Sequence, residues 1–274
     1  MLVGARRLVA VAAGATALLA VGLVLAAGSE GAAGLRVDTL RLDGVATAGA
    51  IGRVTVSNPS SQTIKLTMTP RRWTQRRGGQ LLPNARKSAV IKNIKVSSKS
   101  FTLKPGAKRI VSVALKATPA AHYLYAALVA RGVPKTKKSG VRPIYQIAIA
   151  VSLRPPASRQ RFRQRASSVR VRKRKKGGVL VDVLVRNRGN MVTPPTGTIT
   201  ITRAKTTRTV KIPARVGVLP KGRVRLPAVV VRGLHSGRYR VKVAVQQTKA
   251  NGQGAGRATA TGRFRLTHNG RVTR

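Results

Sequence analysis

The residue types that usually perform catalysis are scarce in this chain. The only acids among its 274 residues are Glu30, Asp38, Asp43 and Asp182. Catalysis needs paired carboxylates, a nucleophile beside a base, or a cluster of metal ligands. There is no cysteine, the three histidines stand far apart, and no Gly-x-Ser-x-Gly sequence exposes a nucleophilic serine. We therefore predict a protein that is not an enzyme and that binds neither a metal nor a cofactor.

Cations dominate the chemistry instead. Lysine and arginine total 55, which gives a formal net charge of +51. The four acids cannot neutralise this charge internally, so the chain's own field attracts anions. Codon bias in an arginine-rich genome is the alternative, but it does not explain the near absence of Asp and Glu. The composition favours an anionic partner, for which we consider cell-wall polymers and lipid head groups.

Three basic segments contain the candidate polyanion-binding residues. These are Arg172, Lys173, Arg174, Lys175 and Lys176 in the first segment, Arg71, Arg72, Trp73, Arg76 and Arg77 in the second, and Arg161 and Arg163 in the third. The first predicts a tight basic turn between two strands, able to hold phosphate or carboxylate groups. An ordinary solvated hairpin fits the first segment equally well.

The other two segments each have two interpretations. The second contains the only tryptophan of the chain, and Trp beside Arg suits stacking on a sugar ring with an anion paired close by. We slightly favour the alternative, in which Trp73 fills a domain core. The third segment folds on contact with a polyanion or stays mobile, and we favour the mobile state.

The N-terminus has the order of an export signal. Arg6 and Arg7 precede an uncharged apolar run over 8–27, and small residues follow. This order predicts a secretory signal, so everything downstream is expected outside the cytoplasm, at the cell envelope or beyond. The run is also long enough to span a bilayer, which would leave a membrane anchor. Its Ala and Gly content favours cleavage. No second apolar span follows.

The rest of the chain alternates apolar and polar residues. Clear cases lie at 53–56, 64–68, 147–151 and 239–243. A period of two predicts strands with one buried face, and many short strands separated by turn residues are typical of an all-β sandwich or barrel. In 179–185 the odd-numbered valines form one face. Asp182 therefore faces the other way, as a partner for a neighbouring Arg or Lys.

An internal repeat divides the chain into two halves. Asn58 is followed by Leu103-Lys104-Pro105-Gly106 and then Tyr123, while Asn187 is followed by Leu219-Pro220-Lys221-Gly222 and then Tyr239. Leucine and tyrosine are 20 residues apart in both halves, and the first half carries a 13-residue insertion. Pro-Gly suits a type II turn with glycine at positive φ. The tyrosine suits the corner that ties a strand to its preceding loop in immunoglobulin-like domains.

These observations predict an all-β protein with two tandem immunoglobulin-like β-sandwich domains after an N-terminal signal or anchor helix. The expected boundaries are 1–28 for the signal, 35–154 for the first domain with its insertion around 69–100, 155–167 for a basic linker, 168–267 for the second domain, and 268–274 for a polar tail. Two prolines stiffen the linker.

The segments 58–66, 101–109 and 237–239 resemble the WxL-interacting proteins of Gram-positive bacterial surfaces. That resemblance implies a peptidoglycan-binding first domain and a second immunoglobulin-like domain that engages partners. Those proteins end in a membrane helix with a basic tail, which this sequence lacks. The asparagine strand end followed by Leu-x-Pro-Gly is also similar to the sandwich of periplasmic pilus chaperones.

Three functions follow from this interpretation. The leading hypothesis is a non-catalytic cell-envelope protein that binds anionic wall polymers or lipid head groups and leaves edge strands for another surface protein. The first alternative is a chaperone-like assembly factor for exported surface subunits, acting by strand pairing. The second is an extracellular nucleic-acid binder. It is disfavoured, because one Trp, four Tyr and three Phe are too few for a stacking platform.

Overall fold

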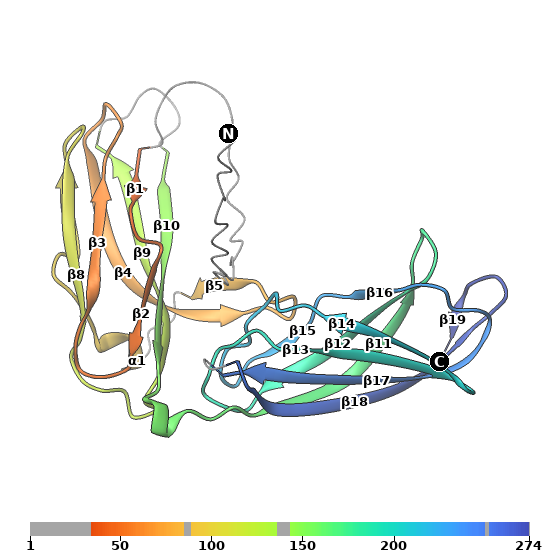
Figure 1. Cartoon of the computed structure of the whole chain (residues 1–274). Helices are drawn as coiled ribbons and strands as arrows, with labels where there is room; N and C mark the ends of the chain where they lie inside the picture. The colour runs from red at the N-terminus through yellow and green to blue at the C-terminus, as the bar shows by residue number, and fades with distance from the viewer. Residues whose placement is uncertain (1–33, 85–88, 136–142, 250–251, 274) are drawn as a thin grey trace, which may run out of the picture.

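The computed structural model describes residues 34–84, 89–135, 143–249 and 252–273. These residues form two immunoglobulin-like β-sandwiches in tandem, joined in a bent, L-shaped molecule (Figure 1). The predicted fold class is confirmed for both domains. The predicted signal or anchor helix lies outside the described residues.

The first domain is built from β1 to β10. Their bounds are β1 (Arg36–Val37), β2 (Arg41–Val45), β3 (Gly49–Ser57), β4 (Ile64–Gln75), β5 (Leu81–Asn84), β6 (Ile94–Val96), β7 (Ser100–Leu103), β8 (Lys108–Leu115), β9 (Leu124–Pro134) and β10 (Tyr145–Arg154), with a short helix α1 (Ala89–Lys92) before β6. One sheet has the order β1-β3-β8-β6. The other has the order β2-β10-β9-β4-β5, and β7 also pairs with β4.

The second domain is built from β11 to β19. Their bounds are β11 (Gln164–Lys173), β12 (Val179–Asn187), β13 (Thr196–Arg203), β14 (Thr206–Ile212), β15 (Arg223–Arg225), β16 (Val229–Val231), β17 (Gly237–Thr248), β18 (Gly254–Leu266) and β19 (Val272–Thr273), and a 3-10 turn η1 (Ala157–Arg159) precedes them. One sheet has the order β11-β12-β15, with β16 also on β12. The other has the order β14-β13-β17-β18-β19.

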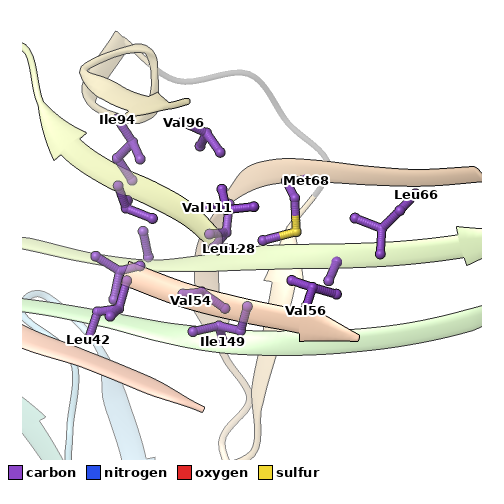
Figure 2. Close-up of a cluster of buried hydrophobic side chains, with 14 of the residues drawn as sticks. Leu42, Val54, Val56, Leu66, Met68, Ile94, Val96, Val111, Leu128 and Ile149 are labelled. Carbon is purple, nitrogen blue, oxygen red and sulfur yellow. The ribbon is translucent and has the colours of Figure 1, made fainter. Parts of the chain in front are cut away.

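The alternating pattern places one face of each strand in a core. In the first domain Val54 and Val56 of β3 pack with Leu66 and Met68 of β4, and all four are buried (Figure 2). In the second domain the odd-numbered residues 179–185 of β12 are buried valines. Each such side chain contributes on the order of 1.5–3 kcal/mol by leaving water. The charged residues are left on the outer faces.

The buried asparagine of each half holds the start of a turn. Asn58 Nδ2 donates to Gln62 O at 2.7 Å and to Leu103 O at 3.1 Å, and its Oδ1 accepts from Ser60 N at 3.1 Å. A buried amide so placed satisfies several backbone groups that water cannot reach. It also ties two segments that lie 45 residues apart.

Asn187 repeats this arrangement in the second domain. Its Nδ2 donates to Met191 O and Val218 O, both at 2.7 Å, and its Oδ1 accepts from Gly189 N at 2.8 Å. Val218, rather than Leu219, is thus the counterpart of Leu103. The repeat is genuine, but matching the two leucines placed its second segment one residue out of register.

With this register, the two turn prolines and the residues after them correspond. Gly106 has φ of 71°, as predicted, while its counterpart Lys221 has φ of 62°. Positive φ is costly for a side chain with a Cβ. The second domain therefore adopts a glycine-type turn without glycine at the strained position.

The tyrosine prediction holds in the second domain. The hydroxyl of Tyr239, on β17, donates to His235 O at 2.6 Å, which is the expected tie to the preceding loop. Tyr123 is not its equivalent, because Tyr123 precedes β9 and its ring lies 5.7 Å from that of Tyr125.

Two expected boundaries differ from the structure. Strand β11 begins at Gln164, inside the predicted linker, and its first four residues pair with β12. A bulge between Ser167 and Arg170 interrupts the alternation there, which hid the strand in the sequence. The expected polar tail contains the two-residue strand β19, which pairs with Arg265 and Leu266.

Candidate functional site

Strand β10 has two neighbours along only half of its length. Its antiparallel partner β9 pairs with Tyr145–Leu153, whereas its parallel partner β2 pairs only with Ala150–Arg154. Within the described residues, no strand pairs with the other edge of β10 over 145–149. We call this stretch the β10 edge.

Alternate residues of the β10 edge turn their backbone N–H and C=O groups away from β9. Ala150 N donates to Leu40 O at 2.8 Å, on the side where β2 lies. Alternate residues of a strand turn their N–H and C=O groups to the same side. Gln146 and Ala148 therefore present theirs toward the unpaired side. Such a row of donors and acceptors is a template for an added strand.

Apolar side chains accompany this edge. Tyr145 and Ile147 are only partly buried where they pack against the first core. Ile144, just before β10, is 55% exposed, and Leu40, just before β2, is 58% exposed. Exposed apolar groups beside unpaired backbone suit a protein partner better than a charged polymer. Sequence alternation predicted the strand but not its missing neighbour.

The two domains are locked together by the end of β4. Gln75 Nε2 donates to Gly217 O at 2.7 Å, and Gln75 Oε1 accepts from Leu219 N at 3.0 Å. Nearby, Arg225 N donates to Arg77 O at 2.6 Å. The predicted insertion thus carries the hairpin of β4 and β5, which contacts the second domain.

Trp73 belongs to this domain junction. It is 9% exposed and forms a small separate cluster with Ala127 and Val129, against which Leu219 of the second domain packs. The expectation that Trp73 fills a sandwich core is corrected, because its side chain lies on the outer face of its sheet. Sugar stacking lacks support too, because the side chain of Trp73 is buried in this cluster. Neighbouring Arg72, Arg76 and Arg77 are exposed.

The basic turn between β11 and β12 has the predicted form. Strand β11 ends at Lys173, the turn contains Gly177 and Gly178 at positive φ, and β12 returns from Val179. Arg172 forms an ion pair with Asp182 at 3.1 Å, and Lys173 Nζ donates to Asn269 O, also at 3.1 Å. Lys175 and Lys176 are exposed, while Arg174 is partly buried.

The third basic segment is held against the second domain. Arg188 N donates to Arg163 O at 2.8 Å, and Asn190 N donates to Arg161 O at 3.0 Å. Both arginine side chains are exposed. These backbone bonds oppose the mobile state that we favoured. The three predicted basic segments do not converge on one surface, because the β11–β12 turn lies at the end of the second domain remote from the first (Figure 1).

Asp182 has the partners that the sequence predicted. It is 3% exposed, and its carboxylate accepts from Arg225 at 2.6 Å as well as from Arg172. Among the described residues no group of three His, Asp or Glu could hold a metal ion.

Tyr125 also lies at the domain junction. Burial raises the pKa of Tyr125 to about 12, and its hydroxyl donates to Asn190 O of the second domain at 3.2 Å. This hydrogen bond links the two domains in addition to those of Gln75 and Arg77.

Comparison with known proteins places this fold. No protein-family model and no curated protein sequence matches the chain. A chain of the chaperone–tip adhesin complex of CFA/I fimbriae has a similar structure, with a TM-score of 0.50 and 12% identity over 84% of this chain and 98% of that one. The class 5 fimbriae chaperone CfaA gives 0.47 and 11%, over 83% and 98%. The fold is therefore similar to that of a chain of this chaperone–tip adhesin complex.

This structural similarity bears differently on the two family resemblances found in the sequence. The likeness to pilus-chaperone sandwiches is supported, whereas the comparisons give no support to the WxL-interacting proteins or to cell-wall binding. No helix among the described residues is both long and apolar enough to cross a membrane.

Proposed function

We propose that this protein is a chaperone-like assembly factor for exported surface subunits, and that it receives a strand of its client at the β10 edge. The observation that carries the proposal is the half-paired state of β10, whose 145–149 stretch lacks a second neighbour among the described residues. The pilus-chaperone fold supports the same class of function.

The geometry suits an extended segment of a client. Main-chain hydrogen bonds to Gln146 and Ala148 would supply affinity, and the exposed side chains of Ile144 and Leu40 would supply apolar contacts. An unpaired edge also invites self-association, so a dedicated client would protect it. Binding of this kind depends little on salt, because it uses no ion pairs.

A single substitution tests the edge. Ala148→Pro removes one outward N–H, and proline is tolerated where the N–H of an edge strand faces solvent, so the ladder to β9 is retained. We expect the wild-type protein to retain a specific envelope protein in a pull-down at high salt, and the Ala148→Pro variant to lose at least about nine-tenths of it. Mass spectrometry of the eluates measures both.

The chain also offers a matched pair of apolar substitutions. Ile144→Ser and Ile110→Ser remove the same side chain at sites that are 55% and 59% exposed. Only Ile144 adjoins the β10 edge, since Ile110 lies on β8 in the other sheet. Client retention should fall for Ile144→Ser and not for Ile110→Ser. Equal retention by all three variants and the wild type would refute strand pairing at β10.

A further inference from the structure

A basic groove lies where the two domains meet. Its volume is about 610 Å³, and it is walled by the hairpin of β4 and β5 on one side and by β11, β12 and β15 on the other. The cations that line it are Arg77, Arg165, Arg186, Arg188, Lys221 and Arg223. Of these, Arg77 alone is among the candidate residues predicted from the sequence.

Three of these arginines form a row across adjacent strands. Arg165 of β11 lies opposite Arg186 of β12, and Arg186 lies opposite Arg223 of β15. Neighbouring strands are about 4.8 Å apart. Like charges directly opposite each other destabilise a sheet. Such a row is unfavourable by itself, and an anion placed across it would relieve the repulsion.

The described acids do not neutralise the groove. Asp182 is bound to two other arginines, Asp43 pairs with Arg41 at 2.6 Å, and Asp38 accepts from Thr55 N at 2.8 Å. These three are the acids within the described residues. The cations of the groove therefore have no carboxylate partner there.

Domain docking holds the far wall in place. The carbonyl of Arg77 is fixed by its hydrogen bond from Arg225 N, and Gln75, which also lines the groove, is bonded to Gly217 and Leu219. The backbone at Arg77 is thus held beside the row on the second domain. A preorganised cluster loses less entropy on binding than free side chains would.

We propose that this groove is a binding site for a free anion carrying several phosphate groups. Five of the six cations are arginines, whose planar guanidinium binds phosphate oxygens in pairs. The site is concave, so the flat surface of a bilayer would not reach its floor. No aromatic side chain lines it, so it offers bases no stacking surface. The proposal is independent of strand pairing at β10, which uses none of these residues.

Calorimetric titration with sodium tripolyphosphate tests the site. The double variant Arg165→Gln, Arg186→Gln should bind at least about tenfold more weakly than the wild type, because it loses two charge-assisted contacts. The matched control is Lys175→Gln, Lys176→Gln, which removes the same charge from the remote β11–β12 turn and should change affinity less than about twofold. The affinity of the wild type for tripolyphosphate should decrease when the NaCl concentration is raised from about 50 mM to about 200 mM.

Three results would overturn the proposal. One is the absence of tripolyphosphate binding by the wild type, and another is an equal loss in both double variants, which indicates net charge alone. The third is tighter binding to phosphatidylglycerol vesicles than to tripolyphosphate with the same groove dependence, which identifies a lipid head group as the source of phosphate. Thermal unfolding confirms that the groove variant folds, since removing like charges should not lower its melting temperature. Ile144→Ser should leave tripolyphosphate affinity unchanged.

Discussion

The two sandwiches share the same buried asparagine arrangement but differ in their surfaces, which are apolar at exposed sites of the first domain and cationic at the groove of the second. Each is closed by a buried asparagine that bonds two separate turns. Among the described residues, the large apolar side chains left exposed, Leu40, Val45, Ile110 and Ile144, all belong to the first domain. The second domain supplies five of the six cations of the groove. The buried asparagines therefore stabilise the fold of both domains, whereas the differing surfaces carry the proposed binding functions.

This contrast explains how so cationic a chain can pack. Charge is confined to outer faces by strand alternation, and the one buried acid of the second domain is satisfied by arginines from neighbouring strands. Where a carboxylate is present, as at Asp182, the neighbouring arginines form ion pairs with it. Where none is present, they remain available for an external anion.

The largest effect should come from removing the shared framework. Asn58→Ala and Asn187→Ala each leave buried backbone carbonyls without donors, so each should lower the free energy of unfolding by about 3 kcal/mol. Urea denaturation followed by circular dichroism measures the loss. Exposed Asn269→Ala is the control and should change stability by less than about 0.5 kcal/mol.

The size of the two losses bears on the comparison. If the asparagines do equivalent work, their losses should agree within about 1 kcal/mol. A loss below about 1 kcal/mol at either site would mean that the two frameworks differ in energy despite their matching hydrogen bonds.

A smaller effect is expected from removing the carboxylate that pairs with Arg172 and Arg225. Asp182→Asn removes the buried charge between Arg172 and Arg225 and should cost about 2 kcal/mol, a figure reduced because Arg172 is half exposed. Arg186→Gln, in the uncompensated row, should instead raise stability by about 0.5 kcal/mol at low salt. Denaturation at low and high salt measures both. A stabilising effect of Arg186→Gln that persists at high salt would argue against repulsion as its cause.

The sequence predicted what depends on local pattern. Alternation at Val54 and Val56, or along the valines of β12, reports directly which face is buried. It failed where local pattern is broken, as at the Ser167–Arg170 bulge. It failed also in the repeat, where a leucine one residue beyond Val218 gave a false match to Leu103.

The candidate sites depend on pairing between distant segments, which composition does not reveal. Arg165, Arg186 and Arg223 become neighbours only through the registers of three strands. The open stretch of β10 depends on where β2 begins, about a hundred residues earlier in the chain. Trp73 was misassigned because its side chain lies on the outer face of its sheet, where Leu219 of the second domain also packs.

A small effect is also expected at the turn position of the shared framework that is glycine in the first domain and lysine in the second. A Cβ added at Gly106 meets no atom within 4 Å, so Gly106→Lys tests the cost of φ at 71° alone and should destabilise by about 1 kcal/mol. The reciprocal Lys221→Gly should stabilise by about 0.5 kcal/mol, because relief of strain is partly offset by greater entropy of the unfolded chain. Gly106→Gln separates charge from conformation and should match Gly106→Lys in chemical denaturation. If Gly106→Lys and Gly106→Gln both leave the free energy of unfolding unchanged, the cost of positive φ does not distinguish the two turns.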